Sequence, residues 1–173
     1  MTRIVVTEFV SLDGVMEEPR WTFDFERGKE GDEFKYTELF DAESLLLGRT
    51  TYQGFAAAWP NMGGDDFGQR MNNIHKYVVS STLTDSDASW GPTTVLRGDV
   101  AAEVEALRNQ PGGNLLVEGS AQLVHTLAQH NLVDAMLASV RYFAAIVAPG
   151  PWADRELANL ERNAELFRAR LPS

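Results

Sequence analysis

The strongest structural signal in this chain is Leu45-Leu46-Leu47-Gly48-Arg49-Thr50-Thr51-Tyr52. A short apolar run, typical of a buried strand, stops at a glycine. An arginine and two hydroxyl residues follow, at the predicted first turn of a helix. Such a junction brings backbone N–H groups, the positive end of a helix and a guanidinium to one point. It therefore predicts a phosphate-binding turn between a strand and a helix.

The composition is that of an ordinary globular protein. The chain has 173 residues, 44% of them hydrophobic, and a formal net charge of −10. No basic run is present, which argues against a nucleic-acid or anionic-membrane partner. The absence of cysteine excludes disulfides and thiolate chemistry, and the three histidines show no ligand spacing, so we expect no metal. Without a signal-peptide core or a span-length apolar run, we expect a cytoplasmic protein.

Predicted strands and helices alternate along most of the chain. Strands are expected at residues 3–10, 44–47, 76–80, 93–96 and 115–117, and helices at residues 32–42, 50–58, 67–73, 100–108 and 121–129. This alternation predicts a largely parallel sheet that is covered by helices on both faces. In such sheets ligands bind beyond the carboxyl ends of the strands.

Five segments resemble the dihydrofolate-reductase-like family, in the family's order and spacing. They read VTEFVSLDGV, LLLGRTTYQGF, KYVVSSTL, LLVEGSAQLVHTL and HNLVD, and they fall within residues 1–134. The bacterial branch with the C-terminal reductase domain of riboflavin biosynthesis is the most similar. The resemblance implies a three-layer α/β/α fold with a mostly parallel, mixed central sheet. It also implies NADPH as cofactor, a heterocyclic small-molecule substrate and a homodimer.

The resemblance ends after Asp134. Residues 135–147 can still supply a strand, whereas residues 154–171 carry apolar side chains at helical spacing. We therefore expect a reductase-like, NADPH-binding domain at residues 1–150 and an atypical helical tail at residues 151–173. That tail could dock on a partner subunit.

The resemblance assigns three turns to the cofactor. The residues that match are Gly48, Arg49, Thr50 and Thr51 for the phosphates, Ser80 and Ser81 for the adenosine 2′-phosphate, and Gly119, Ser120 and Ala121 for the pyrophosphate and nicotinamide ribose. Each turn also has a simpler interpretation, as a capped helix start or a polar strand end. Ser81 stands where family members commonly have a basic residue, so the choice between NADPH and NADH stays open.

Glu118 departs from the family's Gly-Gly turn. A carboxylate beside a pyrophosphate would have to point away from it. The parent reductases carry a cis peptide in this turn, and the corresponding bond here joins Glu118 to Gly119.

Asp32 is the catalytic candidate, because in classical dihydrofolate reductases an acid at the matching place binds the substrate ring. A half-buried carboxylate there could hold the ring and support protonation of its imine nitrogen. Helix capping is the simpler interpretation of an acid at a helix start. Asp13 and Gly14 resemble the start of the loop that closes over the substrate. Trp21 could form an aromatic wall for the substrate or pack within that loop.

Two functions remain open. One is an NADPH-dependent reductase of the dihydrofolate reductase or 5-amino-6-(5-phosphoribosylamino)uracil reductase type, acting on a pterin- or pyrimidine-like C=N bond. The alternative is a catalytically inactive nucleotide-binding or interaction protein on the same fold. Few cationic residues are available for a phosphorylated substrate, which favours a neutral or pterin-like one.

Overall fold

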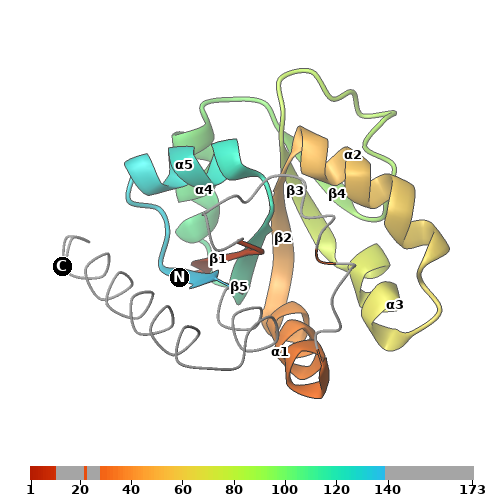
Figure 1. The fold of residues 1–173 in the computed structure, drawn as a ribbon. Coiled ribbons are helices and arrows are strands. Elements are labelled where there is room, and N and C mark those ends of the chain that lie inside the picture. The colour runs from red at the N-terminus through yellow and green to blue at the C-terminus, as the bar shows by residue number, and fades with distance from the viewer. Residues whose placement is uncertain (11–21, 23–27, 139–173) are drawn as a thin grey trace.

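Six strands form one sheet in this computed structural model, which describes residues 1–10, 22 and 28–138 (Figure 1). Their bounds are β1 Arg3–Glu8, β2 Ala42–Gly48, β3 His75–Val79, β4 Thr93–Leu96, β5 Asn114–Glu118 and β6 Ala135–Ala138. The order across the sheet is β4-β3-β2-β5-β1-β6, and all five strand pairs are parallel. A mixed sheet was expected, but the described strands include no antiparallel member.

Helices cover both faces of this sheet (Figure 1). Their bounds are α1 Gly28–Asp41, α2 Arg49–Ala58, α3 Asp66–Asn73, α4 Val100–Arg108 and α5 Ala121–Gln129, with a short 3-10 helix, η2, at Trp59–Asn61. Helices α1, α2 and α3 pack on one face, and α4 and α5 pack on the other. The expected three-layer α/β/α fold is therefore confirmed. None of the helices described here is long and apolar enough to cross a membrane.

Alternating residues of each strand supply two separate cores. In β2, Leu45 and Leu47 pack against the α1–α3 layer, whereas Leu46 packs against the α4–α5 layer. All three leucines are fully buried. A strand covered on both faces needs this continuous apolar run, because neither face meets water.

Helix α1 differs from the sequence-based expectation. It begins at Gly28, a full turn before Asp32, and its first-turn acid is Glu30. Leu39 on this helix is buried, whereas Phe34 is 38% exposed. The loop residues Asp13, Gly14 and Trp21, and the predicted helix at residues 154–171, lie outside the described residues.

A buried lysine anchors β3 under α3. Lys76 is fully buried, and its Nζ donates to the Asn72 carbonyl at 2.8 Å and lies 4.1 Å from the ring centre of Trp90. Trp90 in turn donates its indole N–H to Asn72 Oδ1 at 2.7 Å, and its backbone N–H to Tyr52 Oη at 2.9 Å. Burial lowers the pKa of Lys76 to about 8. This cluster holds α2, α3 and β3 together.

Candidate active site

The starts of α2 and α5 meet where β2 and β5 end side by side. The hydroxyl of Ser120 accepts a hydrogen bond from the Gly48 backbone N–H at 2.8 Å. The same hydroxyl donates to Thr51 Oγ1 at 2.9 Å. We call Gly48, Thr51, Gly119 and Ser120 the helix-start cluster. It joins a helix on one face of the sheet to a helix on the other.

Both glycines of the helix-start cluster are needed for this close approach. A Cβ on Gly48 would lie 3.3 Å from the Ser120 hydroxyl oxygen. Gly119 has φ +58°, and a Cβ there would lie 3.1 Å from the Thr51 side chain. Ser120 also has a left-handed backbone, with φ 66°, which is costly for a residue with a side chain. The hydrogen bonds of Ser120 to Gly48 and Thr51 therefore hold this turn in a strained, left-handed conformation.

The helix-start cluster has the features of an anion-binding turn. Two helix N-termini present backbone N–H groups at one sheet edge, and two glycines keep side chains out of the way. The sequence-predicted residues from Gly48 to Thr51 and from Gly119 to Ala121 are thus brought together. Arg49 is exposed beside them, with its Nη1 at 3.3 Å from Gln53 Oε1. The described residues contain no cis peptide, so the bond between Glu118 and Gly119 is trans.

The third predicted cofactor turn follows β3. Ser80 is buried, and its hydroxyl accepts the backbone N–H groups of Thr82 and Leu83 at 3.1 and 2.9 Å. That hydroxyl therefore closes its own turn, while Ser81 is exposed. Sequence reasoning missed Arg97, whose Nη2 donates to the Leu83 carbonyl at 2.8 Å. Its position directly after a predicted strand was the signal that could have found it.

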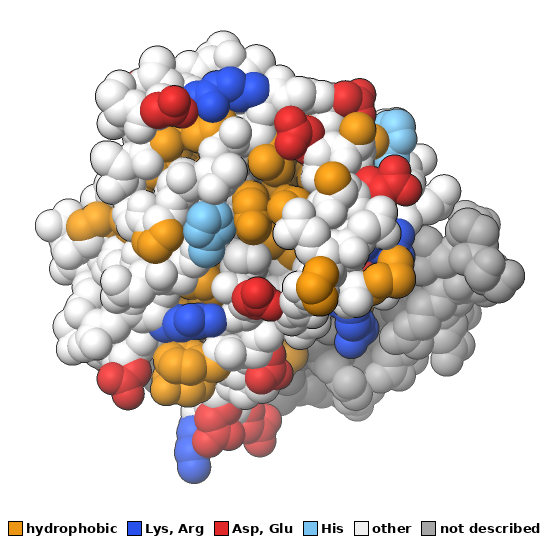
Figure 2. All heavy atoms as spheres, turned by 180° about the vertical axis from the view of Figure 1, so that it is seen from behind, with side chains coloured by type: hydrophobic (Ala, Val, Ile, Leu, Met, Phe, Trp, Pro, Cys, Tyr) orange, Lys and Arg blue, Asp and Glu red, His pale blue; other side chains and the backbone are white. Residues whose placement is uncertain are grey.

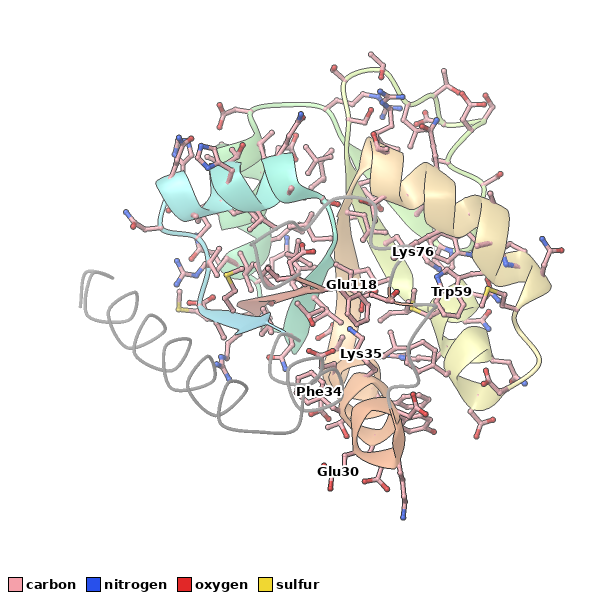
Figure 3. All side chains as sticks on the ribbon, viewed as in Figure 1. Glu30, Phe34, Lys35, Trp59, Lys76 and Glu118 are labelled. Carbon is pink, nitrogen blue, oxygen red and sulfur yellow. The ribbon has the colours of Figure 1, made fainter. Side chains whose placement is uncertain are left out.

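A second group of polar residues lies beneath α1. Lys35 Nζ is 2.7 Å from Glu38 Oε2 and 3.0 Å from Glu118 Oε1, and Thr7 Oγ1 donates to Glu38 Oε1 at 2.7 Å. Figure 3 shows Lys35 and Glu118 reaching toward each other from α1 and β5. We call Thr7, Lys35, Glu38 and Glu118 the buried ion cluster. Its side chains come from three elements.

Electrostatics keep Lys35 charged within the buried ion cluster. Burial alone would lower its pKa, but the carboxylates of Glu118 and Glu38 raise it above the ordinary lysine value. This pairing also explains how a glutamate, Glu118, can stand where the resemblance predicts the first glycine of a Gly-Gly turn. Its carboxylate binds Lys35 and is thereby held away from a ligand at the helix starts.

Glu8 ends β1 next to this cluster. It is 4% exposed, and its Oε1 is buried without a hydrogen-bond partner. Burial raises the pKa of Glu8 to about 8, with a further increase from Glu118 and an opposing effect of Lys35. Sequence reasoning missed Glu8, although a lone acid at the end of an apolar strand was a visible signal.

The structure does not place Asp32 in the buried ion cluster. Its side chain is exposed in the second turn of α1, whereas Lys35 and Glu38 lie on the sheet-facing side. The interpretation of Asp32 as a helix-capping residue is wrong, because α1 begins at Gly28. Its catalytic role stays a prediction.

Comparison with known proteins gives a family and a fold. The model of the RibD C-terminal domain family matches residues 2–141. A solved structure from Shewanella sp. PV-4, of a protein provisionally assigned to riboflavin biosynthesis, is similar with a TM-score of 0.55 and 18% identity. The match covers 79% of this chain and 75% of that one, and at this identity it shows the fold alone. No curated protein matches this chain.

Proposed function

This chain belongs to the RibD C-terminal domain family, and we propose that it is a reductase of the riboflavin-biosynthesis type. Its substrate would be a pterin- or pyrimidine-like heterocycle whose C=N bond is reduced with NADPH. The observation that carries the proposal is the continuity of Glu118, Gly119 and Ser120. Glu118 belongs to the buried ion cluster, and the next two residues belong to the helix-start cluster. On this proposal, the groups that hold the cofactor and the groups that bind the substrate ring would adjoin.

The helix-start cluster would hold the pyrophosphate, and Ala121 would add its backbone N–H at the start of α5. NADPH, when bound, supplies the hydride and its electron pair. The chain's own groups would fix the orientation of both rings and exclude water, and this positioning would supply much of the rate.

Arg97 would supply the positive charge that Ser81 lacks. Its guanidinium spans the turn that begins at Ser80, but it also pairs with Asp85 at 2.7 Å. We expect Arg97→Gln to weaken NADPH binding about tenfold and leave NADH binding unchanged, because only NADPH carries the 2′-phosphate. Calorimetric titration of both cofactors measures this, and Asp85→Asn should have the opposite effect. An equal loss of affinity for NADPH and NADH would contradict a role of Arg97 in binding the 2′-phosphate.

The charge around the buried ion cluster bears on the substrate. Among the described residues, Glu38 and Glu118 pair with one cation, Lys35, and the buried Glu8 ends the neighbouring strand. Acidic groups therefore outnumber cations here, which favours ring N–H and amino groups over phosphate. Over the described part of the rear face, Lys and Arg side chains lie scattered and do not form a patch (Figure 2). Both features favour a neutral ring next to the cluster, with any phosphate of the substrate held elsewhere.

Cofactor binding tests the proposal most directly. NADPH should bind with micromolar affinity, detected by energy transfer from tryptophan or by calorimetry. Dihydrofolate and the ribosylated pyrimidine, compared at equal concentration, should then separate the two substrate types. A protein that binds neither nicotinamide cofactor would contradict the assignment.

One observation favours the alternative of a binding protein without catalysis. The predicted catalytic acid, Asp32, is exposed and outside the buried ion cluster. Cofactor binding without turnover, unchanged in Asp32→Asn, would support this second function.

A further inference from the structure

Glu8 occupies an unusual place for an acid. It follows four buried residues, Ile4, Val5, Val6 and Thr7, at the end of β1, which lies between β5 and β6. Its Oε1 is enclosed and accepts no hydrogen bond. Burying a polar oxygen without a hydrogen bond costs free energy. No interaction within β1 offsets that cost.

The strand register places Glu8 one residue beyond the pair formed by Thr7 and Glu118, where β5 leads into the helix-start cluster. Thr7 is opposite Glu118 in the strand register and turns toward α1, where it binds Glu38. Side chains alternate along a strand, so Glu8 turns to the other face, which α5 covers. The turn from Gly119 to Ala121 begins that helix. Glu8 is therefore next to the expected place of the nicotinamide ribose.

The charges around Glu8 decide which acid keeps a proton. Glu38 and Glu118 are both paired with Lys35 from α1, at 2.7 and 3.0 Å. Among the described residues, Glu8 forms no such ion pair. Burial disfavours the charged form of Glu8, and the carboxylate of Glu118 adds to this effect while Lys35 opposes it, so Glu8 is the acid that keeps its proton.

We propose that Glu8 is the catalytic acid that protonates the substrate nitrogen, an inference that rests on the proposed function. The O–H bond of Glu8 breaks and an N–H bond forms, using the electron pair that the C=N bond releases to nitrogen when its carbon is reduced. Glu8 is left as a carboxylate near Lys35 and regains its proton from water. Asp32 is not required for this step.

The test combines kinetics with a measurement on the resting protein. Single-turnover reduction by the wild type should slow as the pH rises through about 8. Glu8→Gln keeps the size and a hydrogen-bond donor but releases no proton. It should lower the rate about 10²- to 10⁴-fold, lose this pH dependence, and bind NADPH as the wild type does. Glu105→Gln, an exposed glutamate on α4, is the matched control and should behave as the wild type.

Infrared spectroscopy reports the proton without any turnover. The wild type at neutral pH should show the carbonyl band of a protonated carboxylic acid, shifted in heavy water, and this band should be missing in Glu8→Gln. Absence of the band from the wild type overturns the proposal, even if the variant fails to fold.

The possible kinetic outcomes separate this inference from the proposed function. Reduction by the wild type with an unchanged rate and pH profile in Glu8→Gln would overturn the role of Glu8 alone. The same holds if Asp32→Asn, and not Glu8→Gln, abolishes the pH dependence. No reduction of any ring by the wild type would overturn the proposed function, and this inference with it.

Discussion

A single buried carboxyl, Glu8, couples the stability of this protein to pH. Its folded pKa of about 8 lies above the ordinary value of 4.5, so between these limits the unfolded chain releases a proton that the folded protein keeps. This contribution is fully present below about pH 4.5 and is lost as the pH rises toward about 8. The free energy of unfolding should fall by up to about 1.4 kcal/mol per pH unit in that window.

Glu8→Gln should remove this fall, because glutamine does not titrate. Urea denaturation of both proteins across the window measures the difference, since the other titrating groups are shared. Parallel curves for the wild type and Glu8→Gln would show that Glu8 ionises freely.

Lys35 pairs with two carboxylates, those of Glu38 and Glu118. Lys35→Met leaves the buried Glu38 and the partly buried Glu118 without their cation, which should destabilise the protein by about 3–5 kcal/mol in urea denaturation. Lys29→Met on the same helix is the matched control. Lys29 pairs with Glu33 at 3.6 Å, but its side chain is 88% exposed, so the change should stay within about 0.5 kcal/mol. An equal loss of unfolding free energy in both variants would show that the burial of the Lys35 ion pairs does not affect stability.

At the scale of elements, the helix-start cluster should couple cofactor affinity to the packing of α2 against α5. Ser120→Ala removes the acceptor of the Gly48 N–H, which should destabilise the protein by about 1–3 kcal/mol. NADPH affinity should fall about tenfold, as the two helix starts separate.

The variant Ser120→Gly distinguishes the effect of the hydroxyl from the effect of the left-handed backbone conformation. Glycine relieves the left-handed conformation but also lacks the hydroxyl, so it should lose the same affinity with a smaller loss of stability. Calorimetry and urea denaturation measure the two effects. Full affinity in Ser120→Gly would contradict a role for the hydroxyl.

Elements with strong local signals were predictable from the sequence. Helix α4 was predicted with its correct bounds, and in the structure Asp99 caps it, with its side chain accepting the Ala102 N–H at 2.9 Å. Helix α1 was predicted too short. Its first turn contains Gly28 and Gly31, which disfavour a helix locally, and packing overrides that preference.

The residues of the candidate site were also predictable only in part. The glycine and hydroxyl turns at strand ends were predictable, since each junction has its own local pattern. The buried ion cluster was not, because Lys35, Glu38 and Glu118 meet only after α1 folds onto β1 and β5. Contacts between residues far apart in one sequence leave no local pattern.

At the scale of the whole molecule, the homodimer stays a prediction. Residues 154–171, outside the described part, carry the amphipathic pattern that suggested a role in it. If this segment contributes to dimerisation, truncation at about residue 150 should halve the mass measured by light scattering. An unchanged mass would place the interface elsewhere, and NADPH binding by the truncated protein would serve as the folding control.

The amine of Lys76 lies over the ring of Trp90, and this arrangement gives the protein an optical indicator of its own. Because burial lowers the pKa of Lys76 to about 8, a change of its charge near this pH should alter the fluorescence of Trp90. Because the amine is sealed from water, chemical labelling reagents reach it only when α3 lifts from the sheet. The pair of Lys76 and Trp90 should therefore report the pH through fluorescence, and the opening of α3 through the labelling rate of Lys76.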